Sequence, residues 1–545
     1  MKITKQYIGL MLLMLLMVSL PAYSASEANF VKLYKTYTLN ADGSSEERVY
    51  KELKIFTHAA MNGKYGESFI VYNPEYQELK INDSYTVQKN GNIVRTPENA
   101  FVEVLPSVAA NAPAYNHLKE MVVVHTGLEL GATIVLDYSI ISKGGRTGEL
   151  DIFSPVKELS PISDFTFTVN VPESKTLHYE LLNSNVRPSV KVKNGVKTVT
   201  YKMKNVQASP YQYPCTSLPV VQQVASGMMP VVVANTYKNF DAALSVLESQ
   251  MKVGDKKVID NKIAEFKEEV GDDKQNLRDA IGKFMSYLYS KKGFVKVSLK
   301  ESGYRIRPAS EVLRSMYGTR AELANLDVAL QKAAGIDAEI KICSVKLEDA
   351  NYGGLAGIVG VLADSELTPM KVALINEPYC NFAEYINTTT IKGEQCTLNG
   401  TKSSLSSVVS INYLRNLEFT TENSKEIPGG YTVMTLPGQM AASLYYNYSA
   451  NTTMQENILL PYKYNIDDET KLKLPEGKVW MKKSDVSVSN KIGEVSFKYV
   501  EEDGVIKVTR KLKINEQLIT VSDYKLFYSL MSEWKDVNNH TIVVR

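Results

Sequence analysis

The segment Tyr317-Gly318-Thr319-Arg320-Ala321-Glu322-Leu323-Ala324-Asn325-Leu326, which runs on to Ala333-Ala334-Gly335-Ile336-Asp337-Ala338, decides the fold of the middle of the chain. Thr319 and Glu322 have the spacing of a capping box, in which each side chain hydrogen-bonds the backbone N–H of the other residue. Gly335 suits the left-handed conformation that commonly follows a helix. We therefore predict a helix from 320 to 334, whose buried face carries Leu323, Leu326, Leu330 and Ala333.

The flanking residues extend this helix into an α+β domain. Helical periodicity begins near residue 239, and a further apolar stripe is formed by Leu277, Ile281, Phe284 and Leu288. A short helix is expected after Ser310, and strand-like runs follow at 338–347 and 370–375. Because the helices come first and the strands after them, we predict an α+β domain over 235–410.

Residues 26–225 alternate between apolar and polar side chains in many short runs, such as 133–140 and 165–171. Asn90-Gly91 and Asn194-Gly195 lie between such runs, and Asn-Gly supplies the positive φ of a two-residue hairpin turn. We predict an antiparallel β-sandwich or barrel here. A proline-rich stretch at about 205–235 is interpreted as a crossover or a linker between domains.

Residues 411–545 return to strand patterns and are predicted to form a smaller β-rich domain. A run through Val495 leads by Asp503-Gly504 to 505–514, which predicts a hairpin. Ser522 is expected to cap a closing helix, whose apolar residues are Tyr524, Phe527, Leu530, Met531 and Trp534. The chain is therefore predicted to be multidomain.

Residues 1–25 have the features of an export signal peptide. Lys2 and Lys5 precede the apolar run 8–20, which is too short to span a bilayer, and Ala22 and Ser24 suit cleavage. No cysteine lies near that point, so we do not expect a lipoprotein. The rest of the chain should be soluble in a periplasm or outside the cell.

Charge and hydropathy exclude two classes of partner. The 545 residues include 62 basic and 60 acidic side chains, and this near balance argues against binding to nucleic acid. No later run is apolar enough to be a membrane span. The sequence does not indicate the oligomeric state.

The order of these parts resembles an exported architecture of Gram-negative bacteria, in which a β-rich domain of unknown function, a transglutaminase-like core and a β domain follow one another. The resemblance rests on 88–104, with Arg95-Thr96-Pro97-Glu98-Asn99-Ala100-Phe101, on 318–338, and on a tail with Leu474-Pro475-Glu476-Gly477 and 524–527. It implies a papain-like α+β core. In active members it implies cysteine-based acyl transfer or amide hydrolysis.

That chemistry needs a thiolate, an imidazole that activates it and a group that orients the imidazole. Arg320 stands where the family has its cysteine, and a guanidinium is not a nucleophile. No histidine lies between Arg320 and His540. We therefore expect a pseudoenzyme with no catalytic residue, cofactor or metal site. His117 and His125, with Glu120, are more easily explained as isolated histidines than as a metal site.

The four cysteines are Cys215, Cys343, Cys380 and Cys396. Disulfides are permitted in an exported protein, and Cys380 with Cys396 closes the shortest loop between neighbours, so this pair is the first prediction. Buried free thiols are the alternative. Cys343 lies in an apolar, strand-like run and is expected to be buried.

The leading hypothesis is a non-catalytic scaffold or binding protein. A groove formed by Tyr317, Thr319, Arg320 and Glu322 would bind an extended peptide, a protein or a glycan, and Arg320 would pair with a carboxylate. One alternative is a cysteine-type acyl transferase or amidase with a relocated nucleophile. The other is a carbohydrate-binding accessory protein that uses tyrosine clusters, although core and strand tyrosines are the commoner explanation of Tyr211, Tyr213, Tyr237, Tyr445, Tyr446 and Tyr448.

Overall fold

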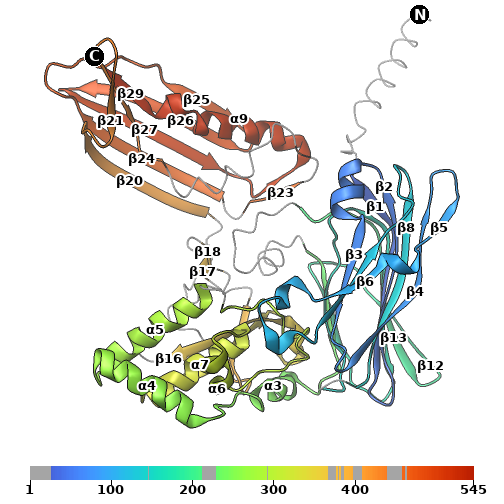
Figure 1. Cartoon of the computed structure of the whole chain (residues 1–545). Helices are drawn as coiled ribbons and strands as arrows, with labels where there is room; N and C mark the ends of the chain where they lie inside the picture. The colour runs from blue at the N-terminus through green and yellow to red at the C-terminus, as the bar shows by residue number, and fades with distance from the viewer. Residues whose placement is uncertain are drawn as a thin grey trace, which may run out of the picture. The chain divides into compact units, whose positions relative to one another are not determined.

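The computed structural model describes residues 26–144, 147–210, 229–290, 293–365, 376–377, 380–381, 386–396, 408–438, 454, 457–460 and 463–545 (Figure 1). The chain divides into two compact units, which are described separately. The larger unit comprises Glu27–Ser209 and Pro214–Val409, and the smaller one is built from Ser410–Arg545. Several sheets and few helices make up the structure, which confirms a multidomain, β-rich protein.

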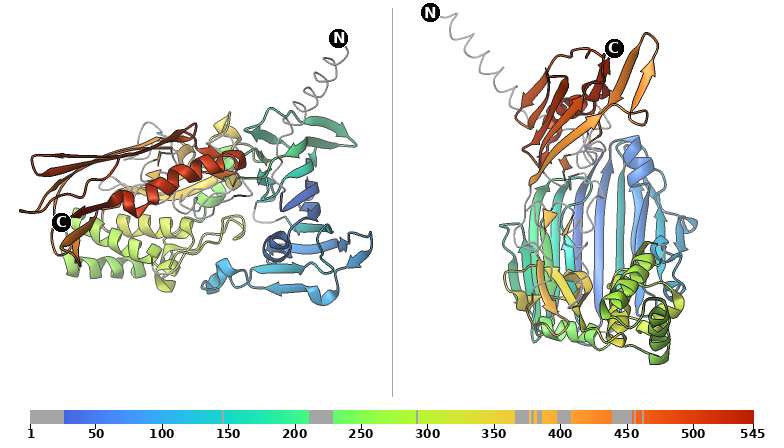
Figure 2. Two further views of the ribbon diagram at one scale, coloured as in Figure 1. Left: turned by 90° about the horizontal axis from the view of Figure 1, so that it is seen from above. Right: turned by 90° about the vertical axis from the view of Figure 1, so that its left-hand side faces the viewer.

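An eight-stranded sheet forms the frame of the larger unit (Figure 2). In spatial order its strands are β12 (Ser189–Lys193), β13 (Val196–Val206), β10 (Ile162–Pro172), β1 (Ala28–Leu39), β2 (Ser45–Ile55), β8 (Thr133–Ser142), β4 (Gln77–Val87) and β5 (Ile93–Arg95). The prediction of a purely antiparallel domain is wrong at one place, because β1 and β10 are parallel. The long connection between these strands allows β10 to reach the free edge of β1 in the same direction.

Two three-stranded sheets cover one face of the large sheet. One contains β3 (Glu67–Tyr72), β7 (Lys119–Val124) and β6 (Phe101–Val104), and the other contains β11 (His178–Leu182), β14 (Val231–Asn235) and β9 (Asp151–Pro155). Alternate residues of β10 fill the space between the layers, and Phe165, Phe167, Val169 and Val171 are all fully buried. The arrangement is sandwich-like. The linker predicted at about 205–235 is wrong at its end, since 231–235 are the central strand of a sheet, and 211–228 lie outside the described residues.

The Asn-Gly turns differ from one another. Asn194 and Gly195 have φ of 51° and 73° and join β12 to β13 as a two-residue turn, as predicted. At Asn90-Gly91 only Gly91 has positive φ. The loop from β4 to β5 is longer than two residues, because the last paired residues of the two strands are Val87 and Ile93. Within this loop the Gly91 N–H donates to Gln88 O. The two-residue prediction is therefore wrong at this second turn.

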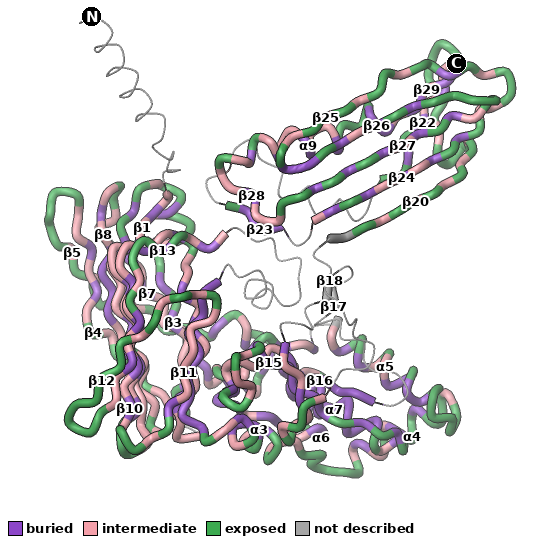
Figure 3. Tube along the Cα trace, turned by 180° about the vertical axis from the view of Figure 1, so that it is seen from behind, coloured by how far each residue is buried: buried purple, intermediate pink, exposed green. Residues whose placement is uncertain are grey.

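The rest of the larger unit places helices and a small sheet around one central helix. The helices are α3 (Phe240–Glu248), α4 (Lys256–Val270), α5 (Lys274–Ser290), α6 (Ala309–Ser315) and α7 (Arg320–Ala333). The sheet has the order β16 (Ile358–Ser365), β15 (Ala338–Val345), β19 (Ile386–Thr390). One side of α7 packs on α4, α5 and α6, and the other side packs on α3, β15 and β16. Every residue of Ala321–Gln331 is consequently buried, as the purple trace of α7 in Figure 3 shows.

The predicted start of α7 is confirmed, and the helix ends at Ala333, one residue before the predicted end, with Ala333 only partly buried. Thr319 and Glu322 form the capping box, and Gly335 has a φ of 73°. The strand predicted at 338–347 is observed as β15, whereas the one predicted at 370–375 lies outside the described residues.

A segment from the β-rich part reaches across to the helical part of the same unit. The short turns η3 (Ser107–Ala109) and η4 (Pro113–Tyr115) carry Ala109, Ala112 and Tyr115 into a shared core with Val295 and Val297. This contact brings Tyr115 to the start of α7.

The smaller unit is a five-stranded antiparallel sheet with a helix against it. The strands are β20 (Val408–Glu418), β24 (Lys463–Lys473), β27 (Val505–Ile514), β26 (Gly493–Glu502) and β25 (Val486–Asn490), and the helix is α9 (Tyr524–Lys535). Its minor elements are β21 (Ser424–Ile427), β22 (Tyr431–Thr435), β29 (Thr541–Val544), β23 (Ile458–Leu459), β28 (Leu518–Ile519) and α10 (Val537–His540).

Two sequence predictions for this unit have opposite outcomes. Asp503-Gly504, with φ of 50° and 75°, makes the predicted hairpin turn between β26 and β27. The capping prediction for Ser522 is wrong, because the Thr520 hydroxyl accepts the N–H of Asp523 and a short 3-10 turn precedes α9. None of the helices in the described part of the chain has the length and apolar composition needed to cross a membrane.

Candidate functional site

The start of α7, where the sequence predicts a groove, is closed by a buried ion pair. The Glu322 carboxylate accepts from Arg307 Nε at 2.9 Å and from Arg307 Nη2 at 3.0 Å. It also accepts from the Tyr115 hydroxyl at 2.6 Å and from the backbone N–H of Thr319 at 2.9 Å. Thr319 is 5% exposed, and Glu322 is not exposed at all. Neither side chain can therefore line an open groove.

The other two predicted groove residues are also engaged. The Tyr317 hydroxyl accepts from the backbone N–H of Ala114 at 2.9 Å, and the guanidinium of Arg307 lies 4.6 Å from the centre of its ring. Arg320 is half-buried, and its guanidinium lies 5.3 Å from the ring centre of Phe294. Burial lowers the pKa of Arg320. Among the described residues Arg320 forms no ion pair, so it retains a positive charge that is only partly compensated.

Two cysteines near this region have described side chains, Cys343 and Cys396. Cys343 is fully buried on β15, as predicted, and burial raises the pKa of its thiol to about 12. Burial also raises the pKa of Cys396, which is a free thiol. The predicted Cys380–Cys396 disulfide is therefore wrong: Cys396 instead continues the sheet beside β19, where its N–H donates to Thr388 O. Thr388 pairs on its other side with Cys343, so the two thiols lie two strands apart, which is too far for a disulfide. Cys215 lies outside the described residues, as does the side chain of Cys380.

The histidines serve other contacts. His125 is buried, and its Nε2 lies 2.8 Å from the Ser68 hydroxyl, which also accepts from Lys51 Nζ at 2.7 Å. Burial lowers the pKa of Lys51 to about 8 and that of His125 to about 3. His178 stacks on Tyr352 with ring centres 4.3 Å apart. The described residues contain no group of three metal-ligating side chains, so His117 and His125 are not brought together with Glu120 in such a site.

Of the tyrosines in the predicted clusters, Tyr237 lies among the described residues. Tyr237 is 4% exposed and belongs to the core beside α3. Tyr211, Tyr213 and the cluster at 445–448 lie outside the described residues.

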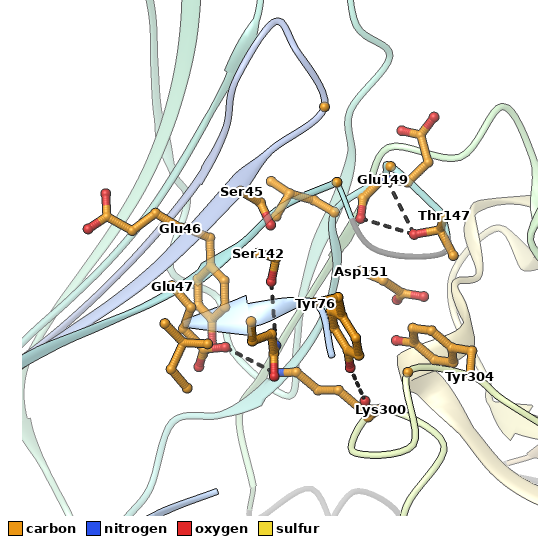
Figure 4. A pocket seen from close by; sticks show the side chains of 18 residues that line it. Ser45, Glu46, Glu47, Tyr76, Ser142, Thr147, Glu149, Asp151, Lys300 and Tyr304 are labelled. Atoms are coloured by element: carbon orange, nitrogen blue, oxygen red, sulfur yellow. Dashed lines mark hydrogen bonds and ion pairs between the residues drawn. The ribbon is translucent and has the colours of Figure 1, made fainter. Parts of the chain in front are cut away.

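A different site is visible where the ends of the β-strands meet the loop that precedes α6. It is a polar cavity of about 100 Å³ (Figure 4). Its walls come from β1, β2, the start of β4, the end of β8, the described part of the loop between β8 and β9, and the loop at 300–304. The lining side chains include Glu47, Tyr76, Ser142, Asp151, Lys300 and Tyr304. All of these belong to the larger unit.

Lys300 and Tyr76 hold the two sides of this pocket together. Lys300 Nζ lies 3.0 Å from Glu47 Oε2, and the Tyr76 hydroxyl donates to the backbone oxygen of Lys300 at 3.1 Å. Glu47 raises the pKa of Lys300. A Cβ at Gly303 would lie 2.6 Å from the Tyr76 ring, and its φ is 64°, so glycine is required for this close approach.

Asp151 forms the back of the pocket and is bound to the loop before β16. Its carboxylate accepts from the backbone N–H of Leu355 at 2.7 Å and of Ala356 at 3.1 Å. Burial raises the pKa of Asp151 to about 6. A Cβ at Gly354 would lie 2.4 Å from Asp151 Oδ1, which explains why glycine stands there.

Sequence reasoning missed this pocket because its residues come from distant segments. Tyr37, Asp151 and Lys300 carry no shared motif. The glycine pair Gly353-Gly354 was a usable signal, since adjacent glycines often mark a close backbone approach.

Comparisons with known proteins assign the two ends of the chain to families. The domain of unknown function DUF3857 matches residues 41–210, and the domain of unknown function DUF3858 matches residues 431–544. No curated protein matches the chain.

One solved structure matches nearly the whole chain. This crystal structure of "a putative protease from Parabacteroides distasonis ATCC 8503" has 32% identity and a TM-score of 0.73, and the match covers 95% of this chain and 99% of that chain. An M1 zinc metallopeptidase from Deinococcus radiodurans has 14% identity and a TM-score of 0.20 over 38% of this chain and 42% of that one, which is too little for an argument. The chain, with its DUF3857 and DUF3858 domains, therefore belongs to the same family as the Parabacteroides distasonis protein.

Proposed function

We propose that the chain is an exported binding or scaffold protein without catalytic activity, and that its central α+β part is a degenerate transglutaminase-like core. The observation that carries this proposal is the start of α7. A nucleophilic cysteine at a helix N-terminus gains acidity from the helix dipole, but Arg320 occupies this position and has no nucleophilic atom at neutral pH.

The surroundings of Arg320 support a structural role for this helix start. A working nucleophile needs a base within hydrogen-bond reach and space for a substrate beside it. Instead, the Arg307–Glu322 pair and Tyr115 fill the space next to the first turn. A helix start whose neighbouring space is filled by packed side chains favours a structural role over a catalytic one.

The alternative is a cysteine-type acyl transferase or amidase with a relocated nucleophile. The printed name of the Parabacteroides distasonis relative, a protease, favours this alternative. The described thiols do not favour it, because burial raises the pKa of both Cys343 and Cys396 and so disfavours the thiolate. Cys215 and Cys380 are the remaining candidates.

Thiol alkylation tests the proposal. The wild-type protein and four single Cys→Ser variants would be treated with iodoacetamide at neutral pH, with labelled sites identified by peptide mass spectrometry. Hydrolysis of labelled casein would be measured before and after treatment.

We expect no cysteine to react faster than the thiol of a short unstructured peptide, and no hydrolysis that alkylation abolishes. A cysteine that is labelled rapidly, and whose serine variant loses a measurable hydrolysis, would establish the enzyme instead. The Cys343→Ser variant is the matched control, because its buried thiol should matter to neither measurement.

A further inference from the structure

More negative than positive side chains line the pocket in Figure 4. Four carboxylates, Glu46, Glu47, Glu149 and Asp151, line it together with one ammonium group, Lys300. Lys300 pairs with Glu47, and Lys175 pairs with Glu149 at 2.7 Å. In the described part of the chain Asp151 forms no ion pair, so the pocket keeps a net negative charge at its back wall.

Two tyrosines lie close to Asp151. Tyr304 is part of the pocket wall, where Figure 4 shows it beside Asp151. Tyr237 is 4% exposed and lies outside the lining, with Asp151 and Thr147 as neighbours of its hydroxyl. The Tyr304 ring and hydroxyl are therefore the aromatic and hydrogen-bonding groups that a ligand at Asp151 would contact.

The size of the cavity limits the ligand to a small molecule. One water needs about 10–15 Å³ of such volume, so a cavity of about 100 Å³ holds roughly seven water-sized groups. An ammonium group at Asp151 would supply the missing positive charge, and the tyrosine rings would add cation–π attraction. Away from Asp151, Ser45 and Ser142 offer hydroxyls for a neutral polar end, as Figure 4 shows.

We propose that this pocket binds a small organic cation that also carries a hydroxyl group, with the cationic end at Asp151 and Tyr304 and the hydroxyl end at Ser142. The site rests on the proposed binding function and gives it a ligand class. It uses the loop at 300–304 but no residue from the start of α7.

A series of three probes of equal length separates charge from size. The probes are 4-amino-1-butanol, 1,4-butanediol and 4-hydroxybutyrate, which share a four-carbon chain with a hydroxyl at one end and carry an ammonium, a hydroxyl or a carboxylate group at the other. Binding to the full-length protein would be measured by isothermal titration calorimetry. We expect the amino alcohol to bind at least about tenfold more tightly than the diol, and the anion to bind least, because only the cation can pair with Asp151.

Variants locate the site. Asp151→Asn should weaken amino alcohol binding at least about tenfold, whereas Glu98→Gln, at an exposed carboxylate outside the pocket, should leave it unchanged. Ser142→Leu fills the cavity without touching Asp151 and should abolish binding. If the Asp151→Asn variant fails to fold, the Ser142→Leu variant still tests whether the amino alcohol binds in this pocket.

Equal affinity for the diol would overturn the proposal in favour of a neutral polyol, and absence of amino alcohol binding to the wild-type protein would overturn it outright. So would unchanged binding to a folded Asp151→Asn or Ser142→Leu variant. These failures are distinct from failure of the proposed function, which is decided by thiol alkylation and casein hydrolysis.

Discussion

The buried pair at the start of α7 makes a quantitative prediction for Glu322→Gln. The side chains of Arg307 and Glu322 are 5% and 0% exposed, so the substitution leaves a buried guanidinium opposite a neutral amide. Breaking a buried pair on one side typically costs about 3–5 kcal/mol. The amide nitrogen of glutamine also cannot accept a hydrogen bond from Arg307 Nη2 or from the Thr319 N–H. Each unpaired donor costs about 1–3 kcal/mol, and this cost is already part of the total given for breaking the pair.

The tryptophans allow the two units to be followed separately. The chain has 2 tryptophans, and both Trp480 and Trp534 lie in the smaller unit. Urea unfolding monitored by tryptophan fluorescence therefore reports that unit, while far-UV circular dichroism also reports α3 to α7. We expect Glu322→Gln to move the dichroism transition to lower urea and to leave the fluorescence midpoint in place.

Two further variants sharpen the interpretation. Asp260→Asn breaks the exposed pair with Lys256 on α4 and should cost only about 0.3–0.5 kcal/mol. The double variant Arg307→Met/Glu322→Leu removes both charges and should recover only part of the lost stability, because the Tyr115 hydroxyl and the Thr319 N–H still lose their acceptor. A loss below about 1 kcal/mol for Glu322→Gln, or an equal shift of the fluorescence transition, would refute the reasoning.

Three further predictions concern other parts of the chain. Arg510 donates to His540 Nδ1 at 2.9 Å, and burial lowers the pKa of His540, so the unfolded state binds the proton at a higher pH than the folded state does. The smaller unit should therefore lose stability as pH falls below about 6.5. His540→Gln should remove this loss in fluorescence-monitored urea titrations at about pH 8 and about pH 5. Cys343, with its pKa raised to about 12, should be alkylated only in denaturing urea, as mass spectrometry would show. Gly354→Ala should cost about 1–3 kcal/mol by dichroism-monitored unfolding because its Cβ would lie 2.4 Å from Asp151 Oδ1, whereas Gly357→Ala, with no atom within 4 Å, should be nearly neutral.

Local sequence signals predict the helix α7 but not the residues that pack against it. The capping box and Gly335 act within a few residues of each other, so the boundaries of α7 could be predicted from neighbours in the sequence. The partners of Glu322 could not. Tyr115 comes from a segment 207 residues earlier, and no pattern in either segment indicates the other. Thr319 and Glu322 of the predicted groove are buried for this reason, since their burial depends on a contact distant in sequence.

The strands of the larger unit show a similar division. Alternation in β10 predicted its buried residues correctly, because period two is a local property. The parallel pairing of β1 with β10 is a property of the chain topology, and no local sequence pattern indicates it. Lys51 was a missed signal: it falls between Val49 and Leu53 on the buried face of β2, where a lysine needs a polar partner, and the structure supplies Ser68.

The pocket and the start of α7 depend on two separate contacts within the larger unit. The loop at 300–304 is held against the strands by Lys300 and Tyr76, and the segment around Tyr115 is held against α7 by Glu322. The first contact forms a wall of the cavity, and the second buries Thr319 and Glu322. Because the cavity takes no residue from α7, a substitution at Arg320 would leave its walls unchanged. If the proposed core has no catalytic activity, it would still supply Lys300 and Tyr304 to the proposed binding site.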